Sequence, residues 1–373
     1  MKKVFALLLC VVIIFSFSSC SSGRSLSDKS VAQAVSVDLV DKETVVGIQY
    51  LDLSKGTATA DGFDNNITSV ATGQADNISS AVSKASASLS GPIFFGQNKL
   101  IVFGKEYAKL GIGGISDYIL RGIDSRPDVL VAICDSSAKD VVSSKENNAK
   151  VPAESLYNMI KTGESVGLSI KVNVNDLLNM YNSKTSDVYL PCLTVNDDKT
   201  SCDGIMLFSE QEPACILDDD ETFGFLLLKD AIKGGMLSSY DKKLGNVGFE
   251  IKSTNLKRKT YFKNNEIHFD VNLKLKLVLN DVQNGVAVKI SADDVSRLEK
   301  IASKKAESLC NAAVGRCLTD KSDALSLGRE LAKYSPVKYD EIKNSWHDEL
   351  PNIKYGINVS SKLELVSDNS IRK

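Results

Sequence analysis

The longest regular pattern in the chain is an alternation of apolar residues between Ile267 and Leu279. Successive side chains of a β-strand point to opposite faces, so a period of two predicts a strand with one buried and one wet face. At about 3.3 Å per residue, this strand would span roughly 43 Å. The apolar positions are Ile267, Phe269, Val271, Leu273, Leu275, Leu277 and Leu279.

The segments around this strand complete a C-terminal α+β unit. Residues 249–262 read as a second extended segment, and residues 263–266 can close a hairpin between the two. Ser291 and Asp294 form a capping-box pattern at the start of a long helix that reaches Cys317. Two shorter helices and a closing strand are expected at residues 323–334, 339–347 and 353–366. We therefore expect an antiparallel sheet with helices covering one face.

The predicted N-terminal and middle domains, residues 31–150 and 151–245, both contain strands and helices. Two β-rich runs, 31–37 and 44–51, flank a polar turn and predict a hairpin. Residues 100–103 and 129–134 are apolar at consecutive positions, as in strands buried on both faces. Helices are expected at residues 76–89, 138–142, 153–161 and 174–181, and further strands at 188–195, 204–208 and 214–217. The pattern predicts sheets covered by helices.

The N-terminus has the organisation of a bacterial lipoprotein signal. Lys2 and Lys3 precede an apolar run over residues 4–15, which is shorter than the roughly 17 residues that a membrane-spanning helix needs. Phe17-Ser18-Ser19 leads to Cys20, whose thiol would accept a diacylglycerol after cleavage. The alternative is ordinary secretion with an unrelated cysteine at position 20.

These segments predict an α+β protein of three domains with mixed or antiparallel sheets, each covered by helices. Since 373 residues exceed what one core usually spans, several domains are expected. The predicted divisions are a signal peptide (1–19), a lipidated tether (20–30), an N-terminal α+β domain (31–150), a middle α+β domain (151–245) and a C-terminal antiparallel sheet with helices (246–373).

Charge and cysteine content exclude several classes of function. Removal of residues 1–19 leaves 43 basic and 47 acidic side chains, a net charge of −4 that predicts no nucleic-acid partner. Cys192 and Cys202 flank a polar turn, so they either pair across a hairpin or remain reduced thiols. No Cys-x-x-Cys motif occurs and only two histidines are present, so we predict no zinc site and no metal cofactor.

No catalytic motif stands out, and we predict that the chain is not an enzyme. Residues 111–114 lack the Gly-Lys-Ser/Thr ending of a phosphate-binding loop, and no Gly-x-Ser-x-Gly elbow occurs. The acidic run 218–221 could bind calcium, but carboxylates at a helix N-terminus are the favoured interpretation. The basic run 257–259 is interpreted as a solvated strand face, and His347, beside the only tryptophan, as a packed side chain.

Several short motifs follow one another along the chain in a characteristic order. They are Arg24, Leu26 and Asp28 after Cys20, then Val35-Ser36-Val37-Asp38, Phe94-Phe95-Gly96-Gln97-Asn98-Lys99, Arg126-Pro127-Asp128-Val129, Ala138-Lys139-Asp140, Leu190-Pro191, Gly204-Ile205-Met206-Leu207-Phe208, Asp220-Glu221-Thr222, Lys233-Gly234-Gly235 and Trp346. Their order resembles the Ger(x)C family of spore germination lipoproteins, in which Trp-Asp-Arg-Arg-Glu-Leu-Asn-Asp follows the lipidated cysteine.

The resemblance implies a non-catalytic lipoprotein subunit of a spore nutrient germinant receptor. Such a subunit is anchored to the outer face of the spore inner membrane and assembles with a membrane-embedded A subunit and a transporter-like B subunit. Cys20 is the one functional position that transfers. The alternatives are a solute-binding lipoprotein of a membrane transporter and, less favoured, a cell-envelope hydrolase.

Overall fold

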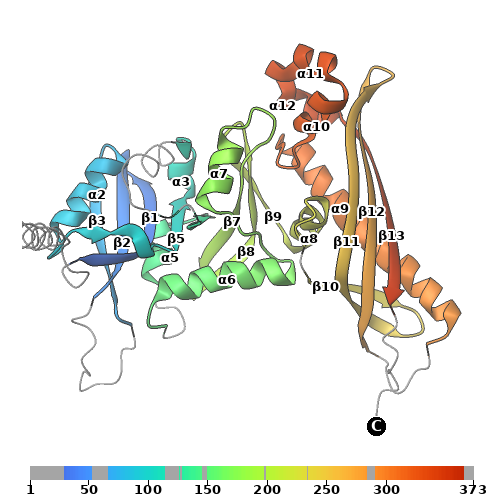
Figure 1. The fold of residues 1–373 in the computed structure, drawn as a ribbon, viewed down its shortest axis with the longest axis horizontal. Coiled ribbons are helices and arrows are strands. Elements are labelled where there is room, and N and C mark those ends of the chain that lie inside the picture. Colours follow the sequence, from blue (N-terminus) through green and yellow to red (C-terminus); the bar gives the residue numbers. More distant parts are fainter. Residues whose placement is uncertain are drawn as a thin grey trace, which may run out of the picture.

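The computed structural model describes residues 29–52, 66–113, 126, 128–144, 149–196, 199–232, 234–283 and 290–364. The predicted signal peptide 1–19 and Cys20 lie outside the described residues. Two β-sheets follow one another along the long axis of the molecule, with helices packed around and between them (Figure 1). No helix in the described ranges is both long and apolar enough to cross a bilayer.

The first sheet has nine strands and mixes parallel and antiparallel pairs. Its central strands β1, β5, β6 and β7 are mutually parallel, and antiparallel strands extend both sides, in the order β3-β2-β1-β5-β6-β7-β8-β9 with β4 beside β1. The strands are β1 (Ser30–Val40), β2 (Glu43–Leu51), β3 (Thr68–Ala75), β4 (Ile93–Phe94), β5 (Leu100–Gly104), β6 (Leu130–Cys134), β7 (Tyr189–Asn196), β8 (Lys199–Ser209) and β9 (Glu212–Leu217).

Helices cover both faces of this sheet, as the doubly apolar strands predicted. In β5, Ile101 and Phe103 belong to the core on one face, while Leu100 and Val102 belong to the core on the other. The first core also takes side chains from α2 (Ile78–Ala87), α3 (Lys105–Ala108) and α7 (Val174–Tyr181). The second takes side chains from α5 (Ala138–Ser143) and α6 (Pro152–Val166).

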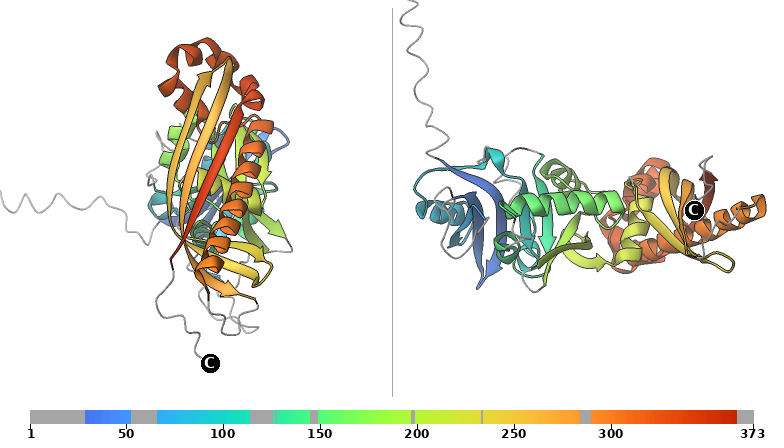
Figure 2. Two further views of the ribbon diagram at one scale, coloured as in Figure 1. Left: turned by 90° about the vertical axis from the view of Figure 1, so that its right-hand side faces the viewer. Right: turned by 90° about the horizontal axis from the view of Figure 1, so that it is seen from below.

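The second sheet contains the long alternating strand. Its order is β10-β11-β12-β13, with bounds Met236–Asp241, Gly245–Lys263, Glu266–Val282 and Lys354–Glu364. The odd-numbered residues of β12 from Ile267 to Leu277 are buried, as the period of two predicted. In the left view of Figure 2 its outer face points towards the viewer, with the rest of the molecule behind it.

This sheet is mixed, so the prediction of a wholly antiparallel C-terminal sheet is wrong. β13 pairs with β12 in parallel over eleven residue pairs, from His268–Lys354 to Val278–Glu364. The chain crosses over between the two strands through a long helix and several short ones, and such a connection returns the next strand in parallel. The sheet also includes β10, which precedes residue 246.

Two helices, one on each side of the β10–β11–β12 segment in the sequence, pack on each other. α8 (Asp219–Leu228) and α9 (Ala292–Thr319) meet at Gly224, where an added Cβ would lie 2.0 Å from the Leu309 carbonyl oxygen. Ser291 and Asp294 form the predicted capping box of α9. The remaining segments are α10 (Leu327–Tyr334), α11 (Pro336–Ile342), α12 (Trp346–Glu349) and the 3₁₀ turns η4 (Phe95–Gln97), η6 (Lys343–Ser345) and η7 (Leu350–Asn352).

The two cysteines flanking the β7–β8 turn are thiols, so no disulfide joins them. Cys192 is part of the core on one face of the first sheet, whereas Cys202 packs against the core on the opposite face. A β-bulge between Pro191 and Leu193 places Leu193, and not Cys192, opposite Cys202. The Cys202 thiol donates a hydrogen bond to Ser169 Oγ at 3.1 Å.

Candidate functional site

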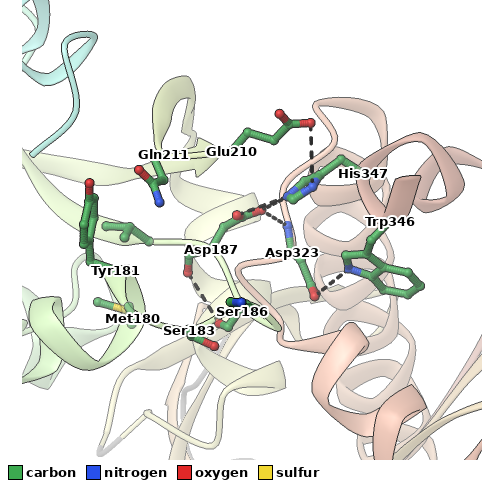
Figure 3. Close-up of a pocket in the computed structure, with 12 residues that line it drawn as sticks. Met180, Tyr181, Ser183, Ser186, Asp187, Glu210, Gln211, Asp323, Trp346 and His347 are labelled. Atoms are coloured by element: carbon green, nitrogen blue, oxygen red, sulfur yellow. Dashed lines mark hydrogen bonds and ion pairs between the residues drawn. The ribbon is translucent and has the colours of Figure 1, made fainter. Parts of the chain in front are cut away.

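A cavity of about 300 Å³ lies where the first sheet meets the C-terminal helices (Figure 3). Its walls come from the end of α7, the residues just before β7, the β8–β9 turn and the start of α12. Four side chains at its base, Asp187, Asp323, Trp346 and His347, are here called the joint cluster. They come from segments more than 130 residues apart and are held together by hydrogen bonds.

Asp187 and Asp323 join the two parts of the molecule through two hydrogen bonds. The Asp187 N–H donates to the Asp323 carbonyl oxygen at 3.2 Å. In return, the Asp323 N–H donates to Asp187 Oδ2 at 2.6 Å. Asp187 directly precedes β7, and Asp323 lies in the turn between α9 and α10. This reciprocal pair therefore fixes the C-terminal helices against the first sheet.

The carboxylate of Asp323 also organises the start of α10. It accepts hydrogen bonds from Leu327 N–H at 2.5 Å and from Gly328 N–H at 2.9 Å. The Trp346 indole donates to its Oδ2 at 2.9 Å. Because α10 starts only after this capped turn, it begins at Leu327 and not at the predicted residue 323. Burial raises the pKa of Asp323 to about 7, although the three donors act to lower it.

His347 is half-buried beside Trp346, in agreement with the expectation of a packed side chain, and in addition it pairs with the carboxylate of Asp187. Its Nε2 lies 2.9 Å from Asp187 Oδ2 and 3.1 Å from Oδ1 (Figure 3). Its Nδ1 faces Glu210 at 3.8 Å. The hydrogen bond with Asp187 raises the pKa of His347, and burial opposes this effect.

The chemistry available to the joint cluster is that of a structural contact. Both ring nitrogens of His347 face carboxylates, and neither is aimed at a serine or cysteine among the described residues. No group of three or more metal-binding side chains occurs in the described part of the chain. Three further hydrogen bonds join the same two parts: Ser186 Oγ with Ser326 Oγ (2.9 Å), Ser209 Oγ to Lys321 O (2.7 Å), and Tyr339 OH to Lys184 O (3.1 Å).

The acidic run 218–221 and the basic run 257–259, which the sequence also suggested as ligand sites, take part in contacts that stabilise the fold. In the acidic run, Asp218 and Glu221 form a capping box at the start of α8, in agreement with the favoured interpretation. In the basic run, Arg258 is not solvated as expected, because its Nε pairs with Glu330 at 2.7 Å and its NH1 donates to the Leu228 carbonyl. Cys20, the predicted lipidation site, lies outside the described residues.

The sequence gives no direct signal for the joint cluster. Asp187 and Asp323 are separated by 136 residues, and each stands in a polar stretch typical of an ordinary surface turn. Their burial arises only when the turn between α9 and α10 packs against the residues that precede β7. The proximity of the only tryptophan to His347 was the one available hint.

Comparisons with protein families match nearly the whole chain. Residues 22–195 match the family described as spore germination protein N-terminal domain. Residues 203–366 match the family described as spore germination B3/GerAC like, C-terminal. The boundary between the two matches falls in the hairpin between β7 and β8.

Curated relatives and one solved structure agree with these family matches. Spore germination protein KC of Bacillus subtilis is 20% identical over 94% of this chain and 93% of its own length. Spore germination protein GerQC of Bacillus cereus is 23% identical over 76% of this chain and 78% of its own. The crystal structure of the GerBC protein has the same fold, with a TM-score of 0.53, 18% identity and coverage of 88% and 96% of the two chains. The chain therefore belongs to the Ger(x)C family of spore germination proteins.

Proposed function

We propose that this protein is a lipid-anchored subunit of a spore nutrient germinant receptor and works through protein contacts, without catalysis. The observation that carries this proposal is the pair of spore germination family matches over residues 22–195 and 203–366. Its relatives KC, GerQC and B3 are named as spore germination proteins and align over most of their lengths. The joint cluster supports the non-catalytic part of the proposal, because its titratable groups hold two parts of the fold together.

Cys20 is the proposed lipid attachment site. The first family match begins two residues after it, at residue 22, so the proposed mature start and the start of the family region coincide closely. A lipid on Cys20 would tether the chain to the outer face of the spore inner membrane. Membrane-embedded A and B subunits of the receptor are the proposed partners there.

The proposed domain limits keep 31–150 for the first unit, but the predicted limit between 151–245 and 246–373 moves to the start of β10 at Met236, because β10 pairs with β11 in the second sheet. The first sheet runs through the first two of these units without interruption, since β6 and β7 pair directly. The proposal therefore treats them as two lobes on a shared sheet, with the C-terminal unit packed on the second lobe through the joint cluster.

Deletion of the gene tests the proposed role directly. Spores without the protein should form in normal numbers but respond slowly or not at all to at least one nutrient. A plasmid copy of the gene should restore that response, measured as release of dipicolinate. Unchanged germination across a panel of sugars, amino acids and nucleosides would contradict the receptor role.

A further inference from the structure

A second cavity, of about 400 Å³, lies beside the joint cluster and shares Met180 and Ser186 with the first cavity. We call it the basic cavity because three cations, Lys171, Lys229 and Arg329, line it. Its walls come from the end of α6, from α7, from β7, from the segment after α8 and from α10. Apolar side chains form another part of the lining, namely Ile170, Val172, Met180 and Ala231.

Lys229 is partly buried, and the groups in direct contact with its ammonium are neutral. Its Nζ donates to the Ala324 carbonyl oxygen at 3.1 Å and lies 4.7 Å from the centre of the Tyr189 ring. No carboxylate among the described residues forms an ion pair with it. Burial lowers the pKa of Lys229 to about 8, and the charges of Arg258 and Arg329 lower it further, while the carboxylate of Asp323 opposes them.

Two carboxylates, Glu164 and Asp176, also line the cavity, and the remaining charges around it have the following partners. Arg258 pairs with Glu330 at 2.7 Å, and Lys171 lies 3.9 Å from Glu164. Asp176 accepts a hydrogen bond from the Asn173 backbone in the capping box of α7. Arg329 is exposed at the rim and has no ion pair in the part of the chain that the structure describes. Among the described residues, Lys229 and Arg329 are thus two cations at one cavity that form no ion pair with a carboxylate.

Keeping an ammonium away from water without a counter-charge is unfavourable. An anion in the cavity would remove that cost, because charge-assisted hydrogen bonds are stronger than neutral ones. The cavity volume of about 400 Å³ falls in the range of small-molecule sites, and its apolar wall suits a carbon skeleton. An inorganic anion has no carbon skeleton that could contact this apolar part of the lining.

We infer that the basic cavity binds a small organic carboxylate, with its charge between Lys229 and Arg329 and its apolar body against Ile170, Val172 and Met180. This site is separate from the protein contacts of the proposed receptor role and does not depend on them. The neighbouring joint cluster supplies a rigid wall for the site, since Ala324, the acceptor of Lys229, follows Asp323 directly.

The test is calorimetric titration of the purified full-length chain with sodium benzoate and sodium pentanoate at constant ionic strength. Benzyl alcohol and pentanol serve as neutral matches. We expect saturable binding of at least one carboxylate below about 20 mM, with thermal stabilisation of the protein, and no binding of either alcohol. Absence of saturable binding by both carboxylates, or equal binding of the alcohols, would overturn the inference.

Three variants locate the binding in the cavity. Lys229→Met keeps the length of the side chain and removes its charge, so carboxylate affinity should fall by about 10-fold or more. Arg329→Gln should weaken it less, because this residue lies at the exposed rim. Lys333→Gln is the matched control on the same helix, since Lys333 lies over the Tyr334 ring and does not line the cavity. Equal affinity in wild type and both cavity variants would place the ligand elsewhere and reject the site.

If Lys229→Met does not fold, the pH dependence of carboxylate binding by the wild-type protein provides a second test. Wild-type affinity should fall between pH 7 and pH 9, as Lys229 with its pKa of about 8 loses its proton. The carboxylate probes stay ionised throughout this range, so the change reports the protein. Asp323, whose pKa is about 7 and whose charge acts on Lys229, becomes ionised at the lower end of the range and adds to the fall in affinity. An affinity that stays constant over this range, together with unchanged binding by Arg329→Gln, would contradict the inference.

Discussion

At the scale of single residues, the stability of the fold depends on the buried carboxylate of Asp323. This carboxylate accepts three hydrogen bonds from α10 and Trp346. Gly328 lets this approach occur, because an added Cβ there would lie 2.9 Å from Asp323 Oδ2 and 3.0 Å from the Trp346 indole nitrogen. Loss of the carboxylate would leave three buried donors without an acceptor.

Asp323→Ala should therefore lower the free energy of unfolding by about 2–4 kcal/mol, since each unsatisfied buried polar group costs roughly 1–3 kcal/mol. Urea unfolding followed by Trp346 fluorescence measures the change near its origin. Asp340→Ala is the control, because that side chain is 71% exposed and its one ion pair among the described residues is with Lys343. A loss in Asp323→Ala no larger than in the control would show that the capped turn contributes nothing.

The Asp187–His347 pair predicts a pH-dependent contribution to stability. The pKa of His347 is raised in the folded protein, so the stabilisation is complete below the unfolded pKa of about 6.5. It disappears as pH rises through the folded pKa. His347→Gln should therefore cost roughly 1 kcal/mol more at pH 5.5 than at pH 9.

Urea unfolding of wild type and His347→Gln at several pH values measures this difference. An Asp187→Asn background is the control, because the histidine then has no carboxylate at 2.9 Å and the extra cost at low pH should vanish. A cost of His347→Gln that does not change with pH would contradict the assignment.

At the scale of elements, the contact between α8 and α9 depends on the absence of a side chain at Gly224. Gly224→Ala would place a Cβ 2.0 Å from the Leu309 carbonyl oxygen, so the helices must separate. We expect a loss of roughly 2–4 kcal/mol in unfolding free energy, as overpacked core substitutions produce. Thermal and urea unfolding would both report it.

Gly315→Ala is the matched control within the same helix pair. Gly315 lies inside α9, and the nearest atom to an added Cβ is Tyr355 OH at 3.8 Å. Alanine should therefore stabilise α9 by about 0.5–1 kcal/mol, since glycine in a helix interior costs conformational entropy. Equal effects of the two substitutions would contradict the close approach of α8 and α9.

Helices and strands could be predicted from the sequence where the pattern that specifies them lies in neighbouring residues. The alternation in β12, the capping box of Ser291 and Asp294, and the β1–β2 hairpin each depend on neighbouring residues and are confirmed. The parallel pairing of β13 with β12 depends on the path of a crossover more than seventy residues long, which no local pattern encodes. The joint cluster has the same origin, since its carboxylates become buried only through long-range packing.

At the scale of the whole molecule, the two family regions share a single sheet. The N-terminal match ends in β7 and the C-terminal match begins in β8, yet these strands pair along their length. Leu190, Leu193, Ile205 and Leu207 on these strands are fully buried. The two halves are therefore parts of one folded unit.

Cleavage of the chain between the two family regions tests whether they form one folded unit. A protease site inserted at residues 197–198 should be cut without separating the fragments, because the β7–β8 pairing and the joint cluster remain. The cut halves should elute together in size-exclusion chromatography and part only in denaturant. The uncut chain is the control, and separate elution under native conditions would show that the halves are independent domains.

The proposed receptor role depends on the anchor, and comparison of Cys20→Ala with Cys10→Ala tests it most directly. Both substitutions remove a thiol from the N-terminal segment, but only the first removes the proposed lipid site. Each variant is placed in spores that lack the native gene, followed by inner-membrane fractionation and nutrient-triggered dipicolinate release. We predict that Cys20→Ala loses both membrane retention and the nutrient response, while Cys10→Ala keeps both. Normal membrane retention and normal germination in Cys20→Ala would contradict the account.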